Sequence, residues 1–161
     1  MRSAPTTRTV WLPKRLLAEA EAWANAWAPL EVGGILAGYI QGAEGVVTHL
    51  VGPGTRATHT RVSFLPDHTY HVDEVARIYR ETEGVSTYLG DWHTHPDGLP
   101  RLSPTDRKTL RNIATDPEAR CPEPLMMILA GSRARWEPVI FQQPTKRQVW
   151  SKEIHSFLRL W

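Results

Sequence analysis

The chain has 161 residues, of which 41% are hydrophobic and 22% are charged. This length is typical of one compact domain, and the composition excludes a disordered chain or a fibrous repeat. The formal net charge of +2 argues against nucleic acid as a partner, because phosphate binding needs a dense basic surface. No stretch has the ~20 apolar residues that a membrane helix requires, so we expect no membrane partner.

Only one cysteine, Cys121, is present, which excludes an intrachain disulfide and a cysteine-based zinc site. It has no partner that could act as a general base at a recognisable spacing, so we do not expect it to act as a nucleophile. Residues 1–8 lack the apolar core of a secretion signal. These features together predict a cytoplasmic protein.

Predicted helices and strands alternate along the first part of the chain. Residues 13–27 carry apolar side chains at helical spacing behind a proline suited to a first turn, and Pro29 ends this helix. The apolar run 32–40 is too short and too rich in glycine for a helix, which predicts a buried strand. Residues 45–51 are predicted to pair with it as a hairpin, and residues 52–60 to be turn and loop.

The same alternation continues in the middle of the chain. A helical pattern between residues 66 and 83 ends at Gly84, and the alternating side chains of residues 85–95 predict a strand. A third helix is predicted to begin at Ser103-Pro104 and to run to about Ala114.

Two further strands are predicted at residues 125–130 and 135–142. All 161 residues are expected to form a single domain of the α/β (α+β) class, with a core at about residues 9–142 and a C-terminal tail at 143–161. Apolar spacing in this tail from Pro144 onward indicates a short helix.

Two histidines, His93 and His95, stand two residues apart on the strand that precedes the third helix. Alternate residues of a strand point to the same face, so both imidazoles can reach one metal ion. Zinc accepts imidazole nitrogen and carboxylate oxygen, and a catalytic zinc site keeps three protein ligands and an open position. Asp106 offers the third ligand from the first turn of the helix that Ser103 begins.

Each part of this pattern has an ordinary structural explanation when taken alone. A His-x-His pair is often two unrelated strand residues, and Ser-x-x-Asp is a common helix start without catalytic meaning. Joined at this spacing, and with Glu31 ahead of the first strand, they form a far more specific pattern. The remaining histidines lack companions at ligand spacing, and we expect surface or packing roles for them. They are His49, His59, His68, His71 and His155.

This pattern resembles the JAMM motif of the JAB/MPN family. The matching residues are Glu31, Gly34, Leu36, Gly38, His93, His95, Ser103 and Asp106. The resemblance extends in order of elements from about Trp11 to Gln142, and it implies the cytidine-deaminase-like MPN fold, a central mixed β-sheet flanked by helices. Family members with the intact motif are zinc metallopeptidases that cleave peptide or isopeptide bonds at the C-terminus of ubiquitin or ubiquitin-like proteins. The resemblance therefore implies Zn²⁺ as the cofactor.

General chemistry assigns roles to the residues around such a metal. A bound metal ion lowers the pKa of its water from ~15.7 toward ~7, and Glu31 is the expected general base that moves the proton to the leaving amine. Ser103 has two candidate roles, as donor to the oxyanion and as helix cap. Asp91 and Asp97 are candidate hydrogen-bond partners for a histidine ring nitrogen. Four basic residues lie in or after the loop between His95 and Ser103, and they form either a solvated face or a surface that steers an acidic substrate. They are Arg101, Arg107, Lys108 and Arg111.

The leading hypothesis is an isopeptidase that cleaves after the C-terminus of a ubiquitin-like protein or its conjugate. The chain is similar to stand-alone bacterial JAB proteins, most clearly over residues 64–68 and 88–96. Several such proteins accompany E1- and E2-like enzymes in conjugation operons, including antiphage systems. The alternatives are processing of sulfur-carrier proteins with the ubiquitin fold, a RadC-like role in DNA metabolism, and a non-catalytic MPN scaffold. The balanced charge argues against the RadC-like role, and the intact ligand set against the scaffold.

Overall fold

The computed structural model describes residues 9–144 and 154–161. Its main sheet is built from strands β1 (Thr9–Leu12), β2 (Gly33–Gln41), β3 (Glu44–Val51), β6 (Thr87–Pro96), β7 (Leu125–Ser132), β8 (Arg135–Gln142) and β9 (Ile154–Leu160). A separate short hairpin consists of β4 (Thr58–His59) and β5 (Phe64–Leu65). The helices of the described residues are α1 (Lys14–Trp27), α2 (His68–Glu81) and α3 (Pro104–Thr115).

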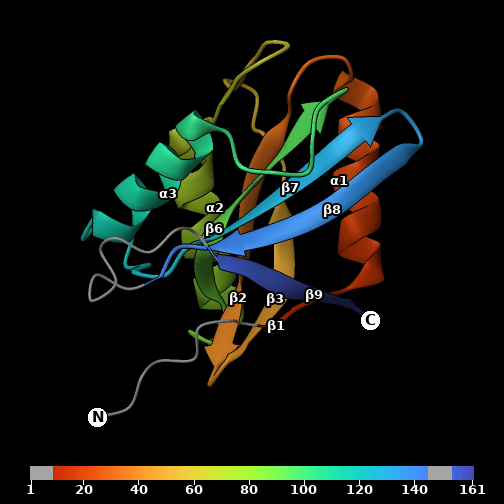
Figure 1. Ribbon diagram of the computed structural model, residues 1–161. Helices are drawn as coiled ribbons and strands as arrows, with labels where there is room; N and C mark the ends of the chain where they lie inside the picture. Colours follow the sequence, from red (N-terminus) through yellow and green to blue (C-terminus); the bar gives the residue numbers. More distant parts are fainter. Residues whose placement is uncertain (1–8, 145–153) are drawn as a thin grey trace.

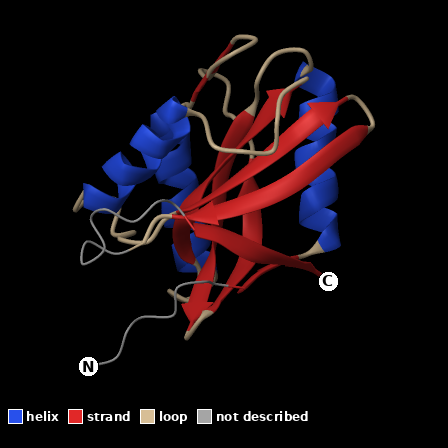
Figure 2. Cartoon of the chain, in the orientation of Figure 1, coloured by secondary structure: helices blue, strands red, loops and turns tan. Residues whose placement is uncertain are grey.

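The main sheet closes on itself in the order β1, β3, β2, β6, β7, β8 and β9, because β1 pairs with both β3 and β9 (Figure 1). It is a mixed sheet, in which β6 runs parallel to β7 and β1 runs parallel to its two neighbours, while the other pairs are antiparallel. Figure 2 shows α1 on one side of the sheet and α2 with α3 on the other. No helix in the described part of the chain has the length and apolar character needed to span a membrane.

The strand β7 is buried on both faces, as its continuous apolar sequence predicts. Met127 and Leu129 belong to the cluster that α1 covers, whereas Met126 and Ile128 pack in the cluster that includes Leu110 of α3. Alternate residues of one strand thus join two separate cores. The parallel neighbour of β7 is β6, which carries the two histidines, and β6 is hydrogen-bonded on its other side to β2.

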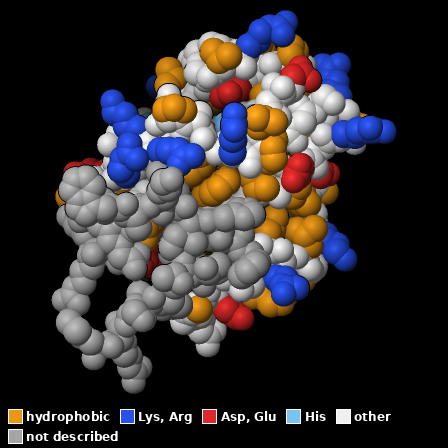
Figure 3. All heavy atoms as spheres, in the orientation of Figure 1, with side chains coloured by type: hydrophobic (Ala, Val, Ile, Leu, Met, Phe, Trp, Pro, Cys, Tyr) orange, Lys and Arg blue, Asp and Glu red, His pale blue; other side chains and the backbone are white. Residues whose placement is uncertain are grey.

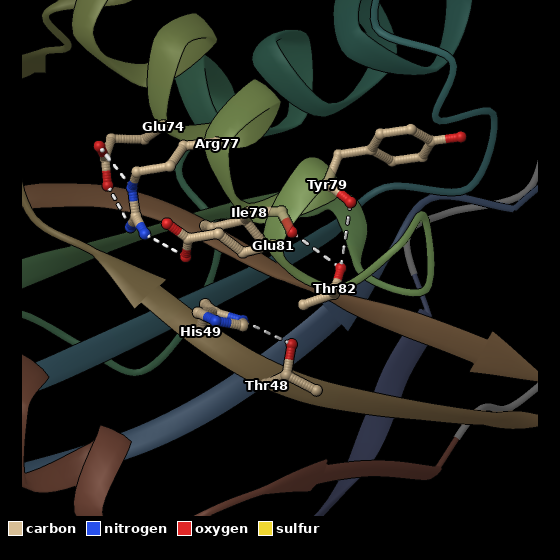
Figure 4. A network of polar contacts seen from close by, with 8 residues as sticks. All are labelled: Thr48, His49, Glu74, Arg77, Ile78, Tyr79, Glu81 and Thr82. Carbon is tan, nitrogen blue, oxygen red and sulfur yellow. Dashed lines mark hydrogen bonds and ion pairs between the residues drawn. The ribbon is translucent and has the colours of Figure 1, made fainter.

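On the side toward β3, α2 carries a network of charged and polar contacts (Figure 4). Arg77 pairs with Glu74 at 2.8 Å and with Glu81 at 2.6 Å. At the end of the helix, the Thr82 hydroxyl donates to the carbonyl of Ile78 at 2.8 Å. His49 of β3 is one of the histidines that were not expected to bind a metal, and its Nδ1 atom lies 2.8 Å from Oγ1 of the neighbouring Thr48. These contacts stabilise the helix and the adjacent strand and lie outside the predicted metal site.

The three predicted helices and the five predicted longer strands are confirmed, with ends that differ by at most two residues. The strand β1 and the hairpin β4–β5 were not predicted. The hairpin lies partly within residues 52–60, which were expected to be turn and loop. Each of its strands is only two residues long, and its pairing depends on contacts that a short sequence window does not contain.

The prediction of a C-terminal helix is wrong for Ile154–Leu160, which form β9. This strand pairs antiparallel with β8 and parallel with β1. Without it, β8 and β1 would both present unpaired backbone groups, and pairing with these edges outweighs the helical spacing of the apolar residues. The part of that prediction that covers residues 145–153 lies outside the described residues.

Candidate metal centre

The end of β6 and the first turn of α3 bring together His93, His95 and Asp106. His93 Nε2 lies 3.0 Å from Asp106 Oδ1, His95 Nε2 lies 3.2 Å from Asp106 Oδ2, and the two Nε2 atoms are 3.1 Å apart. Metal bonds of ~2.0–2.1 Å at tetrahedral angles place ligand atoms about 3.3 Å from one another. The three donors therefore have the chemistry and the spacing that a zinc ion needs. Within the described residues, no other group of three possible ligands comes together in this way.

His93 is positioned by close contact between β2 and β6. Its backbone partner on β2 is Gly33, and its partner on β7 is Ile128. A Cβ atom added to Gly33 would lie 2.4 Å from the Trp92 carbonyl oxygen and 2.9 Å from the His93 Cβ. Only glycine fits here, and its absence of a side chain lets β2 approach the strand that carries the ligands.

The ring of His95 is oriented by the loop that follows β6. Its Nδ1 atom lies 3.1 Å from the carbonyl oxygen of Leu99, and because a carbonyl only accepts, Nδ1 must donate. Nδ1 therefore keeps its proton, and Nε2, which faces the other two ligand atoms, is the ring nitrogen left to bind a metal ion once it is deprotonated. Leu99 takes the role for which Asp91 and Asp97 were candidates. The Asp91 carboxylate instead accepts a hydrogen bond from the hydroxyl of Tyr88 at 2.6 Å.

Ser103 and Asp106 form a capping box at the start of α3. Ser103 Oγ accepts from the Asp106 backbone N–H at 3.1 Å, and Asp106 Oδ2 accepts from the Ser103 N–H at 2.7 Å. The same carboxylate that contacts both histidines is thus fixed by the helix start. A hydroxyl that accepts through Oγ still has its hydrogen to donate, so capping and donation to a substrate are compatible for Ser103.

The electrostatics of the ligand group favour an ionised carboxylate beside the imidazoles. Burial raises the pKa of Asp106, but hydrogen bonds from His93 and His95 outweigh burial and hold this pKa well below its usual range. Burial lowers the pKa of His95, but the contacts with Asp106 and Leu99 raise it by more, so the net shift is upward. Protons therefore compete with a metal ion for the imidazole nitrogens, and metal affinity should fall at low pH.

Glu31 approaches the same face from the residues before β2. The Thr94 N–H donates to the Val32 carbonyl at 2.9 Å, and the Val32 N–H donates to Thr94 Oγ1 at 3.0 Å. Since Gly33 is opposite His93, the antiparallel register continues to place Glu31 level with His95. Burial raises the pKa of the Glu31 carboxyl, and this effect is partly offset by the nearby His93 and His95. A carboxyl with a raised pKa beside a ligand group suits proton transfer near neutral pH.

The structure brings together all the predicted ligands, with Glu31 and Ser103 beside them, and it adds two contacts that were not predicted. The accepting carbonyl of Leu99 has no sequence signal, because every residue carries a carbonyl. The close approach at Gly33 does have one, since glycine inside a strand often marks such an approach. Of the basic residues, Arg101, Lys108 and Arg111 are exposed, and Figure 3 shows Lys and Arg side chains gathered on the face where α3 lies.

Comparison with known proteins agrees with this geometry. The family described as prokaryotic homologs of the JAB domain matches residues 13–150. The protein named probable metalloprotease y4qB, of Sinorhizobium fredii, is 41% identical over 135 residues, which cover 81% of each chain. A protein of Escherichia coli named CD-NTase/cGAS isopeptidase is 32% identical over 108 residues, which cover 66% of this chain and 65% of that protein.

A solved structure shares the fold. The solution structure of protein DSY2949 from Desulfitobacterium hafniense superposes with a TM-score of 0.70 over 94% of this chain and 92% of that one. Its sequence is 21% identical, so this likeness bears on the fold alone. The extent of the family match and of the similarity to the relative from Sinorhizobium fredii establishes that this chain belongs to the prokaryotic JAB-domain family.

Proposed function

We propose that the chain is a zinc-dependent amide hydrolase of the JAMM type, with His93, His95 and Asp106 as metal ligands and Glu31 as general base. The observation that carries this proposal is the convergence of the three ligand atoms, which all lie within 4.8 Å of one another in a member of the JAB family. Two imidazoles and one carboxylate are a common ligand set of catalytic zinc. Zinc is therefore the metal that we expect.

The reaction follows from the residues around the metal position. Bound zinc would supply an activated water at neutral pH and would polarise the scissile carbonyl. Glu31 accepts the proton that the attacking water loses, and it delivers this proton to the nitrogen as the carbon–nitrogen bond breaks. The Ser103 hydroxyl donates a hydrogen bond to the carbonyl oxygen as negative charge develops there. The products are a carboxylic acid and a free amine.

For the substrate, we propose the isopeptide bond after the C-terminus of a ubiquitin-like protein, or of another protein attached in the same way. Support comes from several relatives that are named CD-NTase/cGAS isopeptidase. E1- and E2-like enzymes would then be the partners that form the bond, in a cytoplasmic conjugation pathway of the antiphage kind. The main sheet is closed, whereas the β4–β5 hairpin beside Glu31 is a separate two-stranded sheet with edges to which an extended tail can pair.

The test is cleavage of defined fusions by the purified chain. The probes place a fluorescent protein after the C-terminus of a CD-NTase or of a ubiquitin-fold protein. We expect about one zinc ion per chain, cleavage at the junction, and loss of cleavage with a chelator that added zinc reverses. Glu31→Gln should keep zinc and lose cleavage, whereas His95→Ala should lose both. Undiminished cleavage by a zinc-free preparation, or by folded Glu31→Gln, would refute the proposal.

A further inference from the structure

The β4–β5 hairpin holds the backbone of Glu31 from two sides. The Glu31 N–H donates to the carbonyl oxygen of Thr60 at 2.7 Å. On the other side of the same residue, the Glu31 carbonyl oxygen lies 2.8 Å from Nδ1 of His59. A carbonyl only accepts, so the His59 ring donates through Nδ1. Two consecutive hairpin residues thus fix the peptide groups before and after Glu31.

The His59 ring is itself held by aromatic neighbours. It stacks on the indole of Trp27, the last residue of α1, with ring centroids 3.5 Å apart and planes inclined by 10°. Phe64, its cross-strand partner in the hairpin, lies at 5.4 Å with a tilt of 47°. Stacking therefore fixes the plane of the imidazole, and within that plane the hydrogen bond to the Glu31 carbonyl selects the orientation that points Nδ1 at Glu31.

Glu31 needs such a contact because the sheet does not hold it. The strand β2 begins at Gly33, two residues later, and the ladder bonds to β6 reach only as far as Val32 and Thr94. Correct placement of a proton-transfer group is demanding, since a displacement of about 1 Å can cost ~10²-fold in rate. The main-chain contacts from the hairpin supply the restraint that the strand does not.

We propose that His59 is a positioning residue for Glu31, which sets the place of the general base by a hydrogen bond to its main-chain carbonyl. His59 touches no reacting atom and acts through Glu31 alone. This inference rests on the proposed role of Glu31. It also assigns a purpose to a histidine that the sequence suggested to be an ordinary packing residue.

Two variants of His59 separate the hydrogen bond from the stacking contact. His59→Phe keeps a ring against Trp27 and removes the donor, whereas His59→Asn keeps a donor near the position of Nδ1 and removes the ring. On the fluorescent fusion of a CD-NTase or ubiquitin-fold protein, we expect His59→Phe to lower kcat by at least about 10-fold with KM unchanged. His59→Asn should keep kcat within about threefold of the parent chain, and both should keep their zinc. The exposed His68→Phe is the matched control and should have parental kcat.

A second measurement does not depend on cleavage. Hydrogen–deuterium exchange of the peptide that contains residues 29–33 should be faster in His59→Phe than in the parent chain and in His59→Asn. The inference would be overturned if folded His59→Phe had the same exchange rate and the same kcat as the parent chain. It would also be overturned if both variants lost kcat equally and in proportion to a drop in unfolding temperature. If the parent chain cleaves neither fusion, the proposed function fails, and unchanged exchange in His59→Phe would then separately refute the hydrogen-bond restraint.

Discussion

Gly33 of β2 lies opposite His93 of β6, with room for only a hydrogen atom between the two strands. Gly33→Ala should therefore push β6 away and displace His93. We expect a loss of about 1–3 kcal/mol in the free energy of unfolding, and zinc affinity weaker by about 10- to 100-fold. Chelator competition measures the zinc affinity, and denaturant unfolding measures the free energy of unfolding.

The control for that substitution is Gly42→Ala in the β2–β3 turn. An added Cβ at Gly42 meets no atom within 4 Å, but its φ of 60° is unfavourable for alanine. This variant should lose stability through backbone strain and keep the zinc affinity of the parent chain. Equal zinc affinity in the two variants would contradict the role assigned to Gly33.

The two roles of Ser103 can be separated by substitution. Ser103→Gly should cost only a few tenths of a kcal/mol as a helix cap, because glycine is tolerated at that position. The same change removes the hydroxyl, and kcat for the fusion substrate should fall by about 10²–10³-fold if that hydroxyl stabilises the oxyanion. Ser103→Thr keeps both the cap and the donor and serves as the control. A parental kcat in Ser103→Gly would limit Ser103 to capping.

The raised pKa of Glu31 predicts opposite effects of Glu31→Gln on stability and on activity. Burial raises the pKa of the Glu31 carboxyl in the folded chain above its ordinary value of 4.5. The carboxyl therefore contributes to the free energy of unfolding below pH 4.5, and this contribution is lost as the pH rises through the pKa of the folded state. Metal-free Glu31→Gln should thus unfold at a higher temperature than the parent chain at pH 7, with a smaller difference near pH 4. Calorimetry at the two pH values measures this.

Activity has the opposite dependence on the same group. The base must be ionised to accept a proton, so kcat/KM should fall toward low pH, starting at a pH above the range of an ordinary glutamate. A pH profile measured with the fusion substrate tests this expectation. An acidic limb below pH 4 would show that the burial of Glu31 is relieved in the working enzyme.

The basic residues near the site predict a dependence on salt. α3 has no basic residue in its last turn, whereas Arg107 and Lys108 lie near its N-terminus, where the helix dipole disfavours cations. Such placement favours a role in attracting an acidic substrate. Arg101→Glu with Lys108→Glu should lower kcat/KM at low salt without loss of stability, and the difference should shrink as ionic strength rises. Salt-independent kcat/KM in the parent chain would refute this.

The convergence of His93, His95 and Asp106 was predictable because the three residues lie within one strand–loop–helix unit, whose geometry follows from local spacing. Glu31 is distant in sequence, and its role came from the resemblance to a family. The unpredicted strands β1 and β9 depend on each other across almost the whole chain. The positioning contacts at Leu99 and Glu31 use main-chain carbonyls, which leave no mark in a side-chain pattern.

Closure of the sheet by β1 and β9 has a consequence for synthesis on the ribosome. The first strand has one edge covered early by β3, but its other edge stays open until Leu160 has emerged. All three proposed metal ligands precede β7, so they are already present in the nascent chain while two strand edges remain unpaired. A chain cut after Gln142 would keep these three residues yet expose the edges of β1 and β8, and such edges promote aggregation. We therefore expect the solubility of the truncated chain to depend on the last strand, even though none of the proposed ligands lies in that strand.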